Sequence, residues 1–454
     1  MARSARNLKL TSARKAKHLD HKQSSRTTSM ARSARNLKLT STRKPMHQES
    51  QTNTRARQRA RRSSVYARAA HRAKSTQWAL IAQQTARIVL GDGKYVETRR
   101  APVVSALADT SETPQPSSML PMRTWHIVHN ISAQVRHSVL STTFYPPSHD
   151  FPKPMASVDA SIFEFSRHST LSIVRRLYLT NQPPTQFPYR VHNSNIGILS
   201  PLSRRPGSGF LSGSSTFNAI LARSTSLISS LTSTLAHPFF ASLRERTRLA
   251  DPAAAALSTD ALLYSPSVVG LRRDDADHFE LINDDFDGEL DAIPADPTTK
   301  DLEAPPAVNA QNQRAMGEYV SPYFMNVVSA APILAGAFRS SSHTSLEYES
   351  ERLLRQSVKS RIARVLRLFA ARGDTTLVLG AFGYEEGTPI VMVAQIYAEL
   401  LACSPNPGDV IDGEFRNVFQ KVIFAVPTKL HSMFRNTFEM RIFEDKLIRS
   451  LESC

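Results

Sequence analysis

Apolar segments and amphipathic segments alternate through the second half of the chain. The apolar ones lack polar alternation, and we expect them to be buried strands at Ile196–Leu199, Tyr264–Leu271, Tyr323–Ala330, Thr376–Phe382 and Lys421–Val426. Between them, helical periodicity predicts helices at Ser215–Ser230, Ser350–Arg372, Pro389–Ala402 and Ser432–Leu451. Strands that are apolar on both faces are typical of sheets covered on both sides. The pattern therefore predicts an α/β fold, in which helices flank a mostly parallel sheet.

The segment Ser350–Arg372 has the most regular helical pattern. Its apolar stripe consists of Leu354, Val358, Ile362, Leu366 and Phe369. The basic residues off this stripe include Arg352, Arg355, Lys359 and Arg364. This separation predicts a helix with one face on the sheet and the other in solvent.

The region before residue 196 is less regular. Apolar residues at helical spacing predict a helix after residue 75, and Gly91 and Gly93 should end it. Residues 105–190 contain many prolines and no sustained period, so we expect only short strands or loops there. We place the α/β domain at residues 75–440.

Positive charge is concentrated at the N-terminus. Residues 1–75 contain 21 Lys and Arg but only two acids, Asp20 and Glu49, so they carry a charge of +19. The rest of the chain has 36 basic and 37 acidic residues and is nearly neutral. Like charges at this density resist collapse, and we expect residues 1–70 to be a disordered basic arm. A domain with a basic nucleic-acid-binding surface is disfavoured.

The arm contains a tandem duplication. MARSARNLKLTS occurs at residues 1–12 and again at 30–41, a period of 29 residues that is consistent with a recent duplication or a mis-joined gene model. The arginines within residues 55–62 suit nuclear localisation or non-specific nucleic-acid contact, whereas the acid-poor N-terminus equally fits a mitochondrial transit peptide. Any nucleic-acid contact should be electrostatic, since residues 1–65 contain no aromatic side chain.

The remaining bulk features narrow the class of protein. The only cysteines, Cys403 and Cys454, cannot form a disulfide framework, and no run of about 18 apolar residues suits a membrane span. We therefore expect an intracellular monomer in the nucleus, cytoplasm or mitochondrion, without membrane contact. The histidines show no metal-site spacing, and we expect neither a metal nor a cofactor. The acidic, proline-containing stretch at residues 274–306 should be a flexible insertion between two strands.

One glycine-rich turn could bind phosphate. The stretch RRPGSGFLSGSS, Arg204–Ser215, follows an expected strand and precedes an expected helix. Backbone amides in such turns, together with the helix N-terminus, favour anions. Taken alone, this signal is weak because such turns are common.

The surrounding blocks resemble the microbial-type poly(ADP-ribose) glycohydrolases, which have a macrodomain-like fold. Ile196–Leu231 is similar to the family's signature block, which combines a strand, a Pro-Gly-Gly-Gly loop and a Gln-Glu-Glu helix start. Leu262–Asp275 is similar to its Tyr-Ser-Pro strand that ends in Arg and Asp. Asn326–Pro332 and Leu377–Val426 are similar to its later strands and loops, and Ala79–Val96 to its opening helix. The blocks occur in the family's order over residues 70–440.

The resemblance implies hydrolysis of O-glycosidic bonds of poly(ADP-ribose), with a glutamate of the Gln-Glu-Glu element as acid and base. The three positions are Phe217, Asn218 and Ala219 in this chain, so no carboxylate remains and we assign no catalytic residue. Losing a positioned general acid costs about 10²–10⁴-fold in rate. We therefore expect weak or absent activity.

The ligand-binding positions are altered as well. The resemblance implies two ligand-binding loops, and the candidates are Gly207, Ser208, Gly209, Phe210, Gly380, Ala381, Phe382 and Gly383. Leu199 stands where the family has an asparagine, and Ser208 replaces a glycine. Glu385 and Glu386 in the second loop should repel a diphosphate.

Four functional alternatives remain open. The chain is an eroded copy without function, a pseudoenzyme that binds ADP-ribose weakly, a residual hydrolase that uses Glu385, Glu386 or another acid, or a protein that associates with nucleic acid through its arm.

Overall fold

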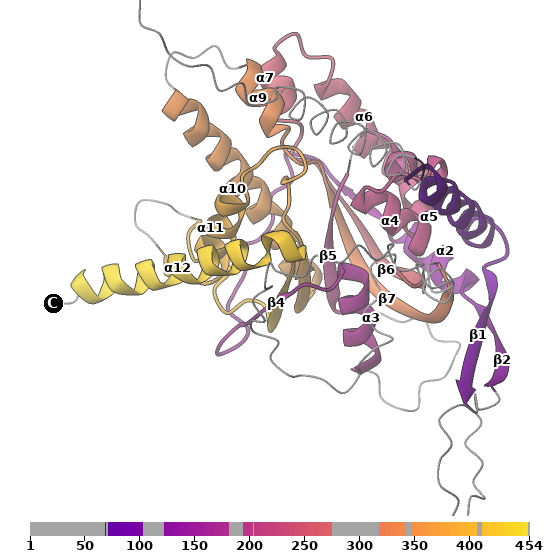
Figure 1. Cartoon of the computed structure of the whole chain (residues 1–454). Helices are drawn as coiled ribbons and strands as arrows, with labels where there is room; N and C mark the ends of the chain where they lie inside the picture. The colour runs from indigo at the N-terminus through magenta and orange to yellow at the C-terminus, as the bar shows by residue number, and fades with distance from the viewer. Residues whose placement is uncertain are drawn as a thin grey trace, which may run out of the picture. The chain divides into compact units, whose positions relative to one another are not determined.

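Seven strands form one mixed sheet in the computed structural model (Figure 1). They are β3 (Thr143–Tyr145), β4 (Ile162–Ser166), β5 (Ile196–Pro201), β6 (Leu262–Arg272), β7 (Tyr319–Ala330), β8 (Thr376–Leu379) and β9 (Lys421–Ala425). Their order across the sheet is β3-β6-β7-β5-β8-β9-β4. The structure describes residues 69, 71–102, 122–180, 194–202, 204–274, 317–341, 347–405 and 411–452.

The centre of the sheet is parallel and one edge is antiparallel. β5 pairs in parallel with both β7 and β8, and β9 pairs in parallel with β8 and β4. β6 runs antiparallel to β7 and to β3. The carboxyl ends of β4, β5, β8 and β9 therefore meet at one edge, the usual place for a ligand in an α/β sheet.

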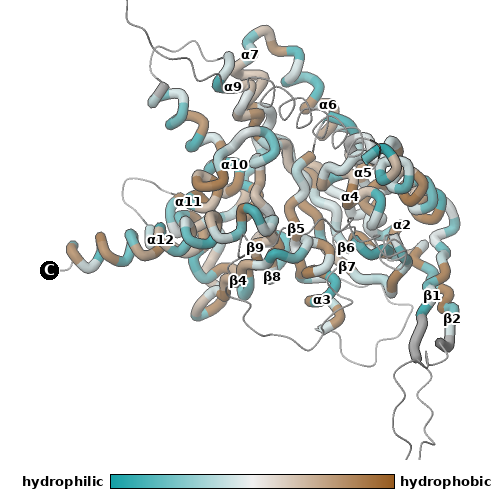
Figure 2. Tube along the Cα trace, viewed as in Figure 1, coloured by the Kyte–Doolittle hydropathy of each residue, from teal (hydrophilic) through white to brown (hydrophobic). Residues whose placement is uncertain are grey.

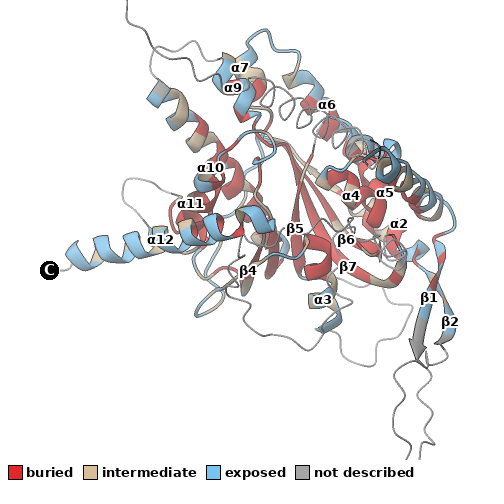
Figure 3. Ribbon diagram, in the orientation of Figure 1, coloured by how far each residue is buried: buried red, intermediate tan, exposed pale blue. Residues whose placement is uncertain are grey.

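Successive strand residues enter two different cores. In β8, Leu377 and Leu379 belong to one buried cluster and Val378 belongs to another. In β9, Phe424 and Ile423 divide in the same way. Because strand side chains alternate between faces, a strand that is apolar throughout is buried on both. Figure 3 shows this as red strands between the helices.

Helices cover both faces, and the α/β fold class predicted from sequence is confirmed. Residues of the first cluster come from α7 (Pro252–Ala256), α9 (Ala335–Ser341), α10 (Glu347–Arg372), α11 (Ile390–Leu401) and α12 (Thr428–Glu452). Residues of the second come from α3 (Thr170–Thr180), α4 (Phe217–Ser224), α5 (Leu227–Leu231) and α6 (His237–Arg246), with the short turn η2 (Thr234–Ala236) beside α6. The result is a three-layer arrangement.

The N-terminal part of the domain packs on the β6–β7 side. Residues 71–89 are helical, and β1 (Lys94–Pro102) pairs antiparallel with β2 (Met122–Asn130). A third cluster joins this region to α2 (Ser132–Leu140) and the sheet through Ala82, Tyr95, Val135 and Val269. Thr85 Oγ donates to the carbonyl of Arg223 at 2.6 Å, which ties the first helix to α4.

Some sequence expectations were wrong in detail. The single helix expected at Ser215–Ser230 is two helices, because Thr225 bridges to Gly270 and the Ser226 amide donates to the Val269 carbonyl at 2.8 Å. The strand expected to reach Phe382 ends at Leu379, and a turn begins at Phe382. Residues 105–190, where only short strands or loops were expected, contain the helices α2 and α3. The buried face of α2 includes the polar residues Gln134 and Ser138, so this helix has no regular apolar pattern in the sequence.

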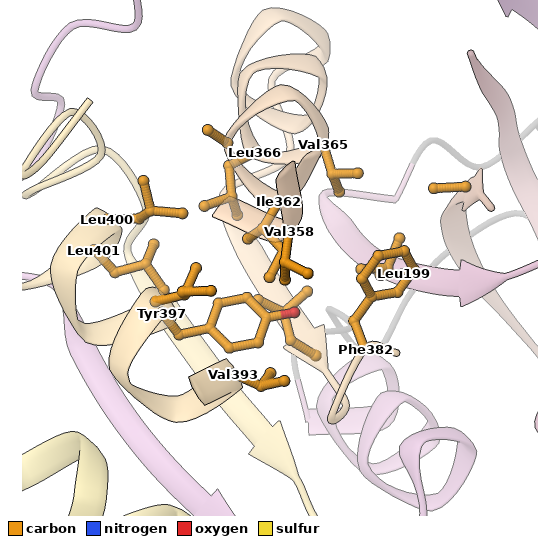
Figure 4. Packing of buried hydrophobic residues seen from close by; sticks show 14 of the residues in the cluster. Leu199, Val358, Ile362, Val365, Leu366, Phe382, Val393, Tyr397, Leu400 and Leu401 are labelled. Atoms are coloured by element: carbon orange, nitrogen blue, oxygen red, sulfur yellow. The ribbon is translucent and has the colours of Figure 1, made fainter. Parts of the chain in front are cut away.

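The polar side of α10 also differs from expectation. Its apolar stripe, of which Figure 4 shows Val358, Ile362 and Leu366, is buried as predicted, but Lys359 and Arg361 are buried too. Lys359 Nζ contacts Glu399 at 3.1 Å and Asp412 at 2.5 Å, and Arg361 pairs with Asp260 at 2.7 Å. This helix is therefore covered by partners on more than one side.

The predicted basic arm lies outside the described residues except for residue 69, and the acidic stretch lies outside them except for Asp274. Their disorder, and nucleic-acid contact through the arm, stay predictions. None of the helices in the described part of the chain is long and apolar enough to cross a membrane.

Candidate functional site

A cavity of about 600 Å³ lies at the carboxyl ends of the parallel strands. Its lining includes Leu199 and Pro201 of β5, Gly380 after β8, Ala425 of β9 and Arg167 after β4. This volume is in the range of small-molecule sites. The sheet topology thus produces a ligand-sized cavity at the edge where one is expected.

The N-terminal ends of three helices border the cavity. Thr170 begins α3, Phe217 begins α4 and Thr428 begins α12, and all three residues line the cavity. Helix N-termini present backbone N–H groups and partial positive charge. This end of the fold therefore offers an electrostatic environment that favours an anion.

The loop after β8 forms one wall of the cavity. The four predicted ligand-binding residues Gly380–Gly383 all line it. Gly383 and Gly387 have φ angles of 83° and 95°, which L side chains rarely adopt, so these glycines shape the turn. The amides of Phe382, Tyr384, Glu386, Gly387 and Thr388 donate to carbonyls within this loop. Those five amides are committed to the turn and are not directed to a phosphate.

Two carboxylates stand on the same loop. Glu385 is exposed, Glu386 is half-buried, and both line the cavity. Burial raises the pKa of the Glu386 carboxyl, and the neighbouring charge of Glu385 raises it further, while a hydrogen bond to the backbone of Glu386 opposes the rise. The negative charge of these two side chains opposes the preference for an anion that the helix N-termini create.

The first glycine loop is placed differently from the second. It forms the short 3₁₀ helix η1 (Pro206–Ser212), and its described residues are not part of the cavity lining, which reaches this region at Ser215 and Phe217. Phe210 is buried in the third cluster with Ala219, Ala222 and Ile228. The side chain of Ser208 lies outside the described part of the chain. Of the eight predicted ligand-binding residues, the structure thus gathers the second four around the cavity.

The three positions at the start of α4 point in different directions. Phe217 lines the cavity, together with Ile220 and Arg223 one and two turns later. Asn218 is buried and its Oδ1 accepts a 2.8 Å hydrogen bond from Ser200 Oγ. Ala219 is fully buried in the cluster that contains Phe210. No carboxylate occupies any of these positions.

Arg223 is a buried cation beside the cavity. Its side chain is fully buried, Nη1 donates to the Ser214 carbonyl at 2.7 Å, and the guanidinium carbon lies 4.8 Å from the centre of the Trp78 ring. Both side chains line the cavity. The cation–π contact holds the helix of residues 71–89 against the end of α4, and the hydrogen bond ties that end of α4 to the segment before the helix.

Comparison with known proteins agrees with this arrangement. Residues 124–273 match the family described as microbial-type PARG, catalytic domain. The structure of poly(ADP-ribose) glycohydrolase (PARG) from Thermomonospora curvata is 24% identical with a TM-score of 0.51, covering 81% of this chain and 99% of that one. None of the curated proteins matches the chain. The resemblance to microbial-type PARG is confirmed.

Two further PARG structures are similar to this chain at lower TM-scores. The T. curvata PARG bound to the inhibitor ADP-HPD is 23% identical with a TM-score of 0.49, and it covers 81% of this chain and 99% of that one. The PARG from Deinococcus radiodurans in complex with ADP-ribose is 23% identical with a TM-score of 0.46. The match covers 68% of this chain and 96% of the D. radiodurans chain. The likeness to the first structure, at 24% identity, concerns the fold, which is the macrodomain-like arrangement of the PARG proteins.

Sequence reasoning missed several side chains of this cavity. Asp274, placed by the sequence in the flexible acidic insertion, is only 5% exposed and lines the cavity. Its position in the family-like strand that ends in Arg and Asp was an available signal. Trp78 on the opening helix and Arg167 after β4 also line the cavity, and no pattern in the sequence marked them.

Proposed function

We propose that this chain is a PARG-like domain that binds ADP-ribose weakly and hydrolyses poly(ADP-ribose) slowly or not at all. The observation that carries the proposal is the environment of the two acid positions. Asn218 is engaged with Ser200, and Ala219 is fully buried beside Phe210. Neither side chain exchanges a proton near neutral pH, so glycosidic bond cleavage lacks the acid that protonates the leaving oxygen.

The cavity walls support weak binding of the ligand. The three helix N-termini favour a diphosphate, whereas Glu385 and Glu386 repel it. Leu199 supplies an apolar surface where an amide could hydrogen-bond the ligand. We expect a dissociation constant for ADP-ribose in the high micromolar to millimolar range.

The direct test is release of ADP-ribose from poly(ADP-ribose) by the full chain at micromolar enzyme. We expect product at no more than a small fraction of the rate of an active PARG assayed in parallel. Turnover at the rate of that PARG would overturn the proposal. A heat-inactivated sample gives the background.

A second candidate is slow hydrolysis by a different carboxylate of the cavity. Glu386 favours this candidate, because it lines the cavity and its burial raises its pKa, a property of general acids. Under this candidate, Glu386→Gln abolishes whatever release the unmodified chain shows, while Glu439→Gln on α12 leaves it unchanged. Equal rates for the Glu386→Gln variant and the unmodified chain would exclude Glu386 as the acid.

A further inference from the structure

The last helix, α12, has two halves with different surroundings. In its first half, Phe434 and Phe438 are buried, and the Phe438 ring lies 5.1 Å from Phe424 and 5.4 Å from Phe163. This half is fixed to the sheet. The second half extends away from the sheet toward the C-terminus (Figure 1) and is largely exposed (Figure 3).

The second half has an exposed apolar stripe. Met440, Phe443, Leu447 and Leu451 follow one another at spacings of three, four and four residues and are 55%, 59%, 50% and 69% exposed. Residues at these spacings lie on one face of a helix. Ile448 borders the stripe, and Met433, seven residues before Met440, continues it. Figure 2 shows hydrophobic residues recurring along α12 to its end.

Such a stripe differs from scattered exposed apolar residues. Large contiguous apolar patches on a soluble protein mark interaction sites. Met433, Met440 and Leu447 recur every seven residues, the period of helices that pack along one another. The chemistry of the surface therefore suits another helix with an apolar face.

The charges beside the stripe are balanced. Residues 439–452 contain four acids and three bases of the chain, interspersed along the helix. Several of them pair within α12: Arg435 with Glu439 at 2.8 Å, Arg441 with Glu444 at 3.8 Å and Arg449 with Asp445 at 3.7 Å. A strongly acidic or basic partner would gain little electrostatic attraction from this surface. Two copies of the segment, in contrast, do not repel each other.

We propose that the Met440–Leu451 segment of α12 packs against the same segment of a second copy of the chain. Each stripe side chain is at least half exposed, so the pair buries an area near the lower limit of specific interfaces, about 1,000 Å². The dimer is therefore weak. This inference departs from the monomer expected from sequence and does not depend on the function proposed for the cavity.

Sedimentation equilibrium of the full chain from about 1 to 200 µM tests the proposal. The weight-average mass should rise from the 50.4 kDa of one chain toward twice that value. The double variant Phe443→Glu/Leu447→Glu should weaken the association at least about tenfold. Lys446→Glu, an exposed position off the stripe, changes the charge by the same two units and should associate like the unmodified chain.

Two results would overturn the proposal. The unmodified chain could stay at the mass of one chain up to 200 µM, or the double variant could associate as tightly as the unmodified chain. Because both substituted side chains are exposed, the variants should keep the far-ultraviolet circular dichroism spectrum and melting temperature of the unmodified protein. Those two measurements verify that each variant is folded.

Discussion

The Ser200 hydroxyl donates a 2.8 Å hydrogen bond to the side-chain oxygen of Asn218. Ser200 is the penultimate residue of β5, and Asn218 is the second residue of α4, so the bond fixes the helix start to the end of the strand. Both residues are buried. A position that the PARG resemblance assigns to acid–base chemistry has here a structural partner inside the protein.

The first prediction concerns this hydrogen bond. In a double-mutant cycle of Ser200→Ala and Asn218→Ala, the coupling energy in urea unfolding should be about 1 kcal/mol, the net value of a typical intramolecular hydrogen bond. Asn218→Ala alone should lower the free energy of unfolding, because it leaves the buried Ser200 hydroxyl without its acceptor. Adding Ser200→Ala to that variant should lower it by less. Additive effects of the two substitutions would contradict the role assigned to this contact.

The second prediction concerns the other acid position. Ala219→Glu should lower the free energy of unfolding by about 3 kcal/mol or more, because a carboxylate enters a fully buried apolar cluster beside Phe210. Ser215→Glu is the control, since Ser215 is exposed at the rim of the same cavity. Equal stability of Ala219→Glu and the unmodified chain would mean that the site still accommodates an acid.

The third prediction concerns charge on the second loop. Glu385→Gln/Glu386→Gln should tighten ADP-ribose binding about tenfold. A carboxylate and a phosphate charge ~5 Å apart repel by roughly 3 kcal/mol at an effective dielectric of ~20, and the exposure of Glu385 to solvent screens part of this repulsion. Calorimetric titration measures the change. Glu439→Gln/Glu444→Gln removes two charges from α12 and should leave the affinity as it was. An unchanged affinity of the loop variant would show that these carboxylates do not face the ligand.

The fourth prediction concerns pH and lies at the opposite end of the sheet. Asp374 accepts from Asn326 Nδ2 at 2.5 Å and from the Tyr264 hydroxyl at 3.2 Å, and burial raises its pKa from 3.8 to about 6. The folded state therefore favours the protonated carboxyl. Its contribution to stability is complete below pH 3.8 and is lost as the pH rises through about 6.

Comparison with Asp374→Asn isolates this contribution. Between pH 4 and pH 7 the unmodified chain should lose stability relative to the variant, by up to about 3 kcal/mol at 1.36 kcal/mol for each unit of pKa change. Chemical unfolding at four pH values measures the difference. A stability difference that stays constant over this range would contradict the raised pKa.

The central strands were predictable because both of their faces are apolar. β5 and β9 lie where the sequence places them, and β8 begins at the predicted residue but ends three residues early. Leu377, Val378 and Leu379 are buried on alternate sides, so no polar residue disguises the pattern. Cys403, which follows the apolar helix pattern of residues 389–402, is 1% exposed. These features depend on local composition alone.

Other features depend on contacts that the sequence does not reveal. The helix break at Thr225 and Ser226 depends on the backbone of β6, more than forty residues later. Lys359 is buried because Glu399 and Asp412 come from other segments of the fold. Asp274 and Trp78 meet at the cavity for the same reason. Tertiary contacts, which no local period encodes, decide these positions.

One titration tests the central claim most directly. The full chain, at about 100 µM in the calorimeter cell, is titrated with ADP-ribose to several millimolar. The altered cavity predicts a dissociation constant in the high micromolar to millimolar range, or no measurable heat. A dissociation constant of a few micromolar or tighter would contradict it and would mean that Leu199, Glu385 and Glu386 leave the ligand site intact.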